Sequence, residues 1–227
     1  MPHVEYHTEH GECIRSVVFG FNDGLVTTLA IVIGITSVIV DSKLIVLIGI
    51  AEMLAGAISM ALGNYISLKS QIDFYKSEIR REKKEIEEMP EAERAEIKEI
   101  YEKKGFRGNL LKQIVKHITA DKKRWLDIMM KEELMLSGKF ANPIKSAVLI
   151  FIAFVVASLI PIMPFFILPI AEAVPIAVAA SVMFLFVSGA VKSRFTKINW
   201  LRSGAEVLAI GLVATGAVYF IGALVAV

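Results

Sequence analysis

Five stretches of the chain are long and apolar, and polar segments separate them. They cover residues 17–40, 44–68, 146–170, 173–191 and 203–227. About 20 apolar residues in a helix cross the ~30 Å hydrocarbon core of a bilayer, so each stretch predicts a transmembrane helix. Pro161, Pro164 and Pro169 predict a kink or a loop at the end of the third stretch. The pattern therefore predicts an all-α membrane protein with five transmembrane helices.

A polar insert, residues 69–142, separates the second and third stretches and holds 33 of the 48 charged residues. Its Glu, Lys, Arg, Ile and Ala content favours helix, and three helices are predicted, over 70–89, 91–104 and 109–136. Pro90 suits the first turn of the second of these helices. Gly105 and Gly108 separate it from the third. The insert is thus predicted to be a three-helix unit whose first helix continues the second transmembrane helix.

Composition supports this organisation and excludes other classes. Hydrophobic residues make up 55% of the chain and the mean hydropathy is +0.60, although 21% of the residues are charged. A net charge of +2 gives no sign of nucleic-acid binding, and a single cysteine excludes a disulfide framework or a thiolate metal cage. Four regions follow: a polar tail (1–14), two transmembrane helices (15–68), the helical insert (69–142) and three transmembrane helices (143–227).

Positive charge predicts the orientation in the membrane. The connection between the fourth and fifth stretches contains four basic residues, whereas the connection between the first two contains only Lys43. Basic loops stay in the cytoplasm, so the N-terminus and the insert are expected there. The membrane would be the plasma membrane in a prokaryote and the vacuolar membrane in a eukaryote.

Two predicted membrane helices carry a carboxylate, Asp23 in the first and Glu52 in the second. A charge at the bilayer centre costs at least about 2.5 kcal/mol and usually faces a pathway or a partner. A buried salt bridge is the alternative, but the spans contain no Lys or Arg to complete it. Met60 follows Glu52 by eight residues and lies near it on the helix face, either as a thioether ligand or as core filling. A thioether beside carboxylates favours a later transition metal, and protons compete with metal ions for carboxylates.

The insert carries the same residue types at helical spacing. Glu82 and Glu85 share one helix face, and so do Glu93 and Glu96. The third predicted helix adds Met129, Met130 and Glu133 within about one turn. These residues could converge on metal ions, but the charge pattern alone favours a solvated Glu/Lys surface. His3, His7 and His10 in the tail have helical spacing, where a disordered tail is the stronger reading and metal capture the weaker.

Three motifs resemble the vacuolar iron transporter family. They are Asn-Asp-Gly-Leu at 22–25, Ala-Glu at 51–52 followed by Ala-Gly-Ala-Ile-Ser-Met at 55–60, and Trp-Leu-Asp-Ile-Met-Met at 125–130 followed by Glu-Glu-Leu at 132–134. The resemblance extends from Arg15 to the end of the chain. One position departs from the family pattern, because Ser16 stands where members often have an acid.

The resemblance implies a homodimer with five transmembrane helices per subunit, a ferrous-iron/proton exchange path along the subunit interface, and a cytoplasmic domain that gathers iron. It assigns Asp23, Glu52 and Met60 to the path. It assigns the metal-binding role in the insert to Glu82, Glu85, Glu93, Glu96, Met129, Met130 and Glu133, which reverses the preference for a solvated surface. Small residues in the second helix (Gly56, Ala57 and Gly63) would allow close approach at the interface.

The expected function is therefore export of Fe²⁺ from the cytoplasm in exchange for protons, with Mn²⁺ or Zn²⁺ as alternative substrates. The protein is expected to be no enzyme and to hold no prosthetic group. A membrane-anchored metal sensor or scaffold is the main alternative, although an anchor has no need of intramembrane carboxylates. A membrane-bound ferroxidase is weaker, since such bundles use Glu-x-x-His pairs and Ile114 stands three residues before His117.

Overall fold

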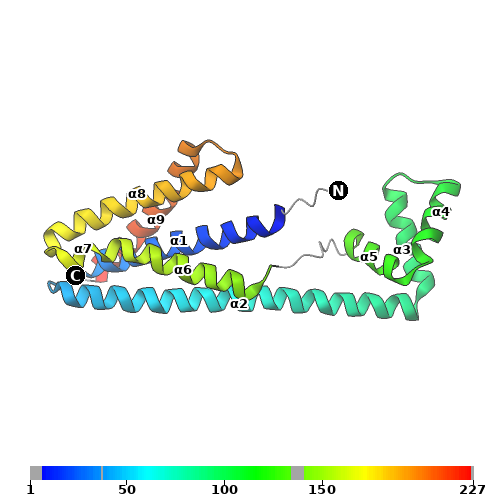
Figure 1. Ribbon diagram of the computed structural model, residues 1–227, viewed down its shortest axis with the longest axis horizontal. Helices are drawn as coiled ribbons and strands as arrows, with labels where there is room; N and C mark the ends of the chain where they lie inside the picture. Colours follow the sequence, from blue (N-terminus) through cyan, green and yellow to red (C-terminus); the bar gives the residue numbers. More distant parts are fainter. Residues whose placement is uncertain (1–6, 37, 134–140, 226–227) are drawn as a thin grey trace, which may run out of the picture. The chain divides into compact units, whose positions relative to one another are not determined.

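The computed structural model describes residues 7–36, 38–133 and 141–225, which form helices and turns without a strand. The helices are α1 (His7–Ile35), α2 (Ser42–Glu88), α3 (Pro90–Lys103), α4 (Gly108–Thr119), α5 (Lys122–Glu132), α6 (Pro143–Ile162), α7 (Pro164–Ile167), α8 (Ile170–Thr196) and α9 (Trp200–Val225). Contacts divide the chain into a membrane unit (1–66 and 141–227) and an insert unit (67–140). Helix α2 contributes to both (Figure 1).

In the membrane unit, α1 packs along α6 and also contacts α8 and α9 (Figure 1). Two glycines one turn apart make the α1–α6 contact close. A Cβ atom on Gly20 would lie 2.6 Å from the Ile150 carbonyl oxygen, and one on Gly24 would lie 2.5 Å from that of Phe154. Ser158 Oγ donates a hydrogen bond to the Gly24 carbonyl oxygen at 3.1 Å across the same contact. Small residues therefore let the two backbones meet.

Four described helices are long and apolar enough to cross a membrane: Cys13–Ile35, Ser42–Glu88, Pro143–Ile162 and Ile170–Arg194. They overlap the first four predicted spans, although the first helix ends at Ile35 and not at residue 40, and α9 covers most of the fifth. The count of five spans stays a prediction. As expected from the prolines, α6 ends at Ile162 and the short α7 follows.

Several predicted boundaries were wrong. The first helix begins at His7, so half of the tail is helical and not disordered; His3 lies outside the described residues. The fourth span is longer than predicted at both ends, because α8 runs from Ile170 to Thr196. Polar ends such as the Lys192–Thr196 stretch continue the helix without adding to the apolar signal.

The insert unit has its own hydrophobic core, built from one or two residues of each helix. The core residues are Ile86, Ile97, Ile118, Trp125 and Met129. Pro90 starts α3 as predicted. Gly105, in the turn that follows, and Gly108, at the start of α4, adopt positive φ angles of 95° and 60°.

The single helix predicted over 109–136 was wrong. The structure has two helices, α4 and α5, which end at Thr119 and begin at Lys122. Asp121 caps α5, since its side chain accepts a hydrogen bond from the Arg124 N–H at 2.7 Å. The break folds α5 back, so that Trp125 and Met129 reach the core beside Ile118.

Candidate functional site

Glu52 of α2 lies inside the membrane unit with a hydroxyl as its partner. Thr28 Oγ1 of α1 donates a hydrogen bond to Glu52 Oε2 at 2.6 Å. Gly56, one turn further along α2, leaves room for Phe154, whose Cζ would lie 2.5 Å from a Cβ at that position. Helices α1, α2 and α6 thus meet around the Glu52 carboxylate.

Asp23 of α1 lies close enough to Glu52 for the two charges to interact. It also lines a cavity of about 610 Å³ between α1, α8 and α9. Arg15 and Lys192 line this cavity as well, and Lys192 forms an ion pair with Glu206 at 3.7 Å. The structure therefore brings the two predicted path carboxylates together.

A second polar contact joins the same three helices at Ser16. Ser16 Oγ of α1 lies 2.8 Å from Ser146 Oγ of α6, and the Asn64 side-chain amide of α2 donates to Ser146 Oγ at 2.8 Å. Asn64 follows the half-buried Met60 by one turn of α2. Ser16 thus takes part in a hydrogen-bond network with Ser146 and Asn64.

The assignment of small α2 residues to a subunit interface was partly wrong. Gly56 packs against Phe154 and Ala57 is fully buried, so both serve contacts within the chain. Gly63 has no neighbour within 4 Å of a Cβ atom and remains available to a second subunit.

In the insert unit, Glu82 of α2 and Glu93 of α3 are buried together, with 1% and 4% of their surfaces exposed. One oxygen of each carboxyl, Glu82 Oε1 and Glu93 Oε2, is buried without a hydrogen-bond partner among the described residues. Burial and the neighbouring Glu133 and Glu93 raise the pKa of Glu82 to about 8. Burial also raises the pKa of Glu93, although the hydrogen bond from Glu82 opposes this. A pKa of about 8 leaves Glu82 protonated at neutral pH, so that it can donate a hydrogen bond to Glu93, and neither group forms an ion pair with a described residue.

Glu133, at the end of α5, faces the same acids. Burial and repulsion from Glu96, Glu93 and Glu85 raise its pKa, and Arg81 partly offsets the rise. Arg81 also binds Glu78 at 3.0 Å and Glu85 at 3.6 Å. Arg81 thus already neutralises part of the negative charge that a bound metal ion would neutralise.

The two methionines assigned to the insert differ in position. Met129 is fully buried in the core beside Trp125, and Met130 is half-buried. No three His, Cys, Asp or Glu side chains in the described part of the chain converge closely enough to hold a metal ion as they stand. The predicted insert ligands are gathered on neighbouring helices, but their metal coordination stays a prediction.

Comparisons with known proteins identify the family of the chain. The VIT family model matches residues 14–223. The chain belongs to the VIT family. The vacuolar iron transporter of Centaurea cyanus is 38% identical over 221 residues, covering 96% of this chain and 89% of that protein. Vacuolar iron transporter 1 of Tulipa gesneriana is 38% identical over 219 residues with the same coverage, and the Toxoplasma gondii (strain ATCC 50861 / VEG) transporter is 34% identical over 234 residues, covering 98% and 78%. The family resemblance read from the three motifs is confirmed.

Family membership makes this chain an integral membrane protein of a metal-transporting family. Sequence reasoning missed three of the polar residues at the site, Thr28, Asn64 and Arg81. Thr28 and Asn64 could have been found from the sequence, because a hydroxyl or amide group in an apolar helix needs a hydrogen-bond partner when it is buried. Arg81 resembled any other residue of a Glu/Lys-rich helix surface.

Proposed function

We propose that this protein is a homodimeric, five-span transporter that exports Fe²⁺ from the cytoplasm in exchange for protons. Glu82, Glu93 and their neighbours collect the ion, Glu52 and Met60 receive it, and Asp23 passes it across the membrane. The N-terminus and the insert face the cytoplasm. Mn²⁺ and Zn²⁺ are alternative substrates.

The observation that carries the proposal is that Glu52 in the membrane unit is half-buried, that Glu82 and Glu93 in the insert unit are buried, and that none of the three forms an ion pair with a described residue. Among the described residues, the Thr28 hydroxyl donates a hydrogen bond to Glu52, and Glu82 and Glu93 have one another. An acid buried in this way gains from binding either a proton or a metal ion. Exchange of one for the other at the same oxygens is the minimum requirement for metal/proton antiport.

The insert supports a collecting role. Metal binding must displace the Glu82 proton that is bonded to Glu93 and draw Glu85 away from Arg81. Both steps weaken binding, and a collecting domain must release its ion. Met130, Glu96 and Glu133 would complete the ligand set, whereas Met129 would have to leave the core.

The test is metal flux into proteoliposomes with an imposed pH gradient, measured separately for Fe²⁺, Mn²⁺ and Zn²⁺. Uptake should require the gradient and vanish in Asp23→Ala, while the protein still elutes as a folded dimer. Glu172→Ala removes an exposed acid at the start of α8 and should transport normally.

The sensor reading predicts a different outcome. No flux of any ion, with metal still bound by the intact protein, would establish a membrane-anchored sensor. Near-normal flux in Asp23→Ala would remove that residue from the path. The names of the relatives favour a transporter over an enzyme.

A further inference from the structure

Thr28 of α1 lies inside the membrane unit and contacts the Glu52 carboxyl group of α2. The threonine is completely buried, with 0% of its surface exposed, whereas Glu52 is half-buried. Its hydroxyl oxygen Oγ1 donates to Glu52 Oε2 at 2.6 Å, which is at the short end of the range for O–H···O hydrogen bonds. A buried hydroxyl of α1 therefore holds one oxygen of an acid that is expected to line the path.

The hydrogen bond of Thr28 differs from the one that a threonine in a helix ordinarily makes. Such a hydroxyl usually donates to a carbonyl of its own helix, three or four residues earlier. Thr36, at the end of α1, does so at 2.7 Å. The equivalent acceptor for Thr28 is the Gly24 carbonyl, which accepts a hydrogen bond from Ser158 Oγ of α6 at 3.1 Å. With that carbonyl engaged by α6, the Thr28 hydroxyl donates to Glu52 instead.

The other oxygen of Glu52, Oε1, lies beside Gly56 in the next turn of α2. A Cβ atom on Gly56 would be 3.2 Å from Glu52 Oε1 and 2.5 Å from Cζ of Phe154. Because Phe154 is 1% exposed, its ring is packed against other residues and cannot move aside easily. The glycine therefore leaves the space in which Oε1 lies, while the Thr28 hydroxyl holds Oε2.

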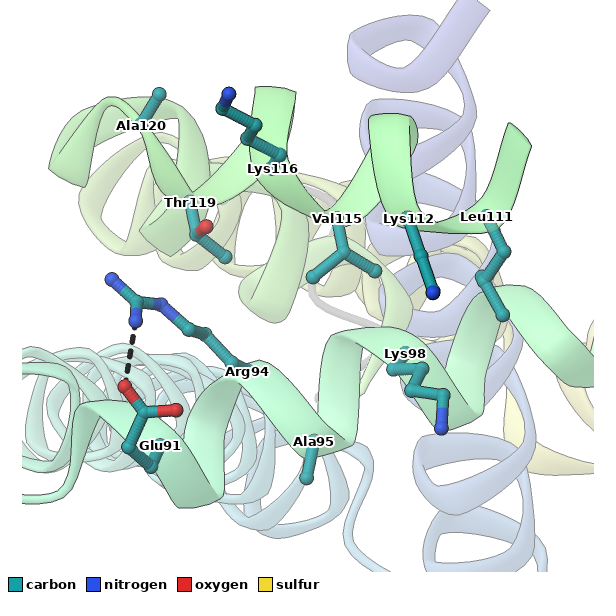
Figure 2. Close-up of a pocket in the computed structure, with 10 residues that line it drawn as sticks. All are labelled: Glu91, Arg94, Ala95, Lys98, Leu111, Lys112, Val115, Lys116, Thr119 and Ala120. Carbon is teal, nitrogen blue, oxygen red and sulfur yellow. Dashed lines mark hydrogen bonds and ion pairs between the residues drawn. The ribbon is translucent and has the colours of Figure 1, made fainter. Parts of the chain in front are cut away.

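Several acids on the surface of the insert unit are paired with cations instead. Figure 2 shows one such pair beside the groove between α3 and α4, where Arg94 and Glu91 approach to 2.6 Å. An arginine beside Glu52 would neutralise the carboxylate and repel an arriving metal ion. A hydroxyl orients the carboxylate and adds no charge, so it suits a site that must accept a cation.

We propose that Thr28 is a positioning residue of the Glu52 site, and that its hydroxyl holds Oε2 so that Oε1 is presented to the metal ion. The inference rests on the proposed function, in which Glu52 receives the ion. Carboxylates that bind metals are themselves held by hydrogen bonds, and the loss of such a bond lowers metal affinity or activity by about 10–100-fold. Thr28 acts through Glu52 and need not touch the ion.

The first test compares Fe²⁺ flux in proteoliposomes for two substitutions of Thr28. Thr28→Val keeps the branched shape but removes the hydroxyl, so the KM for Fe²⁺ should rise about tenfold, with a smaller change in the maximal rate. Thr28→Ser keeps the hydroxyl and should have a KM close to that of the wild type. The matched control is Thr36→Val, which removes a hydroxyl that donates to a backbone carbonyl and not to an acid, and it should transport as wild type.

The second test does not depend on transport. It measures the infrared absorption of the Glu52 carboxyl group in the full-length protein in lipid discs, isolated as the difference between each protein and the same protein with Glu52→Gln. The band should shift in Thr28→Val, where its hydrogen bond is lost, and keep its wild-type position in Thr28→Ser and Thr36→Val. Addition of Mn²⁺ should change the band, and the Mn²⁺ concentration for half of the change should be about tenfold higher in Thr28→Val.

An unchanged KM or an unchanged infrared band in Thr28→Val would overturn the positioning role. A lower KM would overturn it as well, because the hydroxyl would then compete with the ion for Oε2. Equal losses in Thr28→Val and Thr28→Ser would assign the effect to side-chain volume and not to the hydroxyl, and circular dichroism with elution volume identifies a variant that fails to fold.

The two tests also separate this role from the proposed function. Absence of flux in the wild type would overturn the proposed function alone, provided that Mn²⁺ still changes the Glu52 band with the expected order of variants. A wild-type band that does not respond to Mn²⁺ would overturn the positioning role, whatever the flux.

Discussion

The membrane unit holds its half-buried acid, Glu52, in a different way from the buried acids of the insert unit. Glu52 is held by a neutral hydroxyl, that of Thr28, whereas Glu82 and Glu93 are held by each other through the Glu82 proton. The packing differs as well. Backbone contact at Gly24 holds α1 against α6, and large side chains such as Trp125 fill the core of the insert.

The difference indicates how each unit responds to a cation. A carboxylate held by a hydroxyl can accept an ion without breaking a contact between two acids. A carboxyl pair must release its proton first, so its metal affinity depends on pH over the range in which Glu82 titrates. The metal affinity of the insert is therefore expected to depend on pH, and each unit can be disrupted separately.

The largest effect is expected for Glu52→Gln. The amide keeps an oxygen that accepts from Thr28 but removes the charge, so proton-driven Fe²⁺ flux should fall to the level of empty liposomes. Metal binding by the insert should remain unchanged in isothermal titration of the same preparation. Loss of both activities together would contradict the separation of the two units.

Gly24→Ala tests the packing side of the comparison. The new Cβ would lie 2.5 Å from the Phe154 carbonyl oxygen and 2.9 Å from its Cα, so the helices must separate. Overpacking of this kind costs about 1–3 kcal/mol and should lower the melting temperature measured by light scattering and tryptophan emission. Gly216→Ala is the matched control, because no atom lies within 4 Å of the added Cβ. Equal melting of the two variants would show that the α1–α6 contact tolerates expansion.

A smaller effect is expected for Glu82→Gln in metal-free protein. The pKa of Glu82 is raised from 4.5 to about 8, so its contribution to the stability of the wild type is fully present below about pH 4.5 and is lost as the pH rises through 8. The neutral amide avoids this loss, and the melting temperature of the variant should exceed that of the wild type at pH 8 and above.

Glu99→Gln provides the contrast for that measurement. Glu99 is exposed, and its hydrogen bond and charge interaction with Lys103 lower its pKa. This variant should show no gain at high pH. A gain of the same size in both variants would mean that reduced net charge, and not the buried pair, explains the effect.

The smallest effect is expected for Met60→Leu. Leucine keeps the apolar volume but lacks the thioether, so the ratio of Fe²⁺ to Mn²⁺ flux should fall severalfold while total transport persists. The flux assay used for Glu52→Gln provides the measurement. An unchanged ratio would assign Met60 to packing alone.

Much of the helical architecture could be predicted from the sequence, because apolar stretches and turn residues are local signals. The insert helices around Pro90 and Gly105 illustrate this. The break at Asp121 was missed, since the apolar spacing continues across it and only one capping residue marks it. The family and its residue types could be read from short motifs, whereas the partners of those residues could not.

Sequence alone determined that the chain is a helical membrane protein with acids in its spans and a charged insert, because hydrophobic length and residue type are properties of the chain itself. Only the tertiary structure decided which acids meet. Thr28 reaches Glu52 from another helix, and Glu82 meets Glu93 across a turn. These pairings depend on the rotation and crossing of packed helices, and side-chain volumes at the contacts set both.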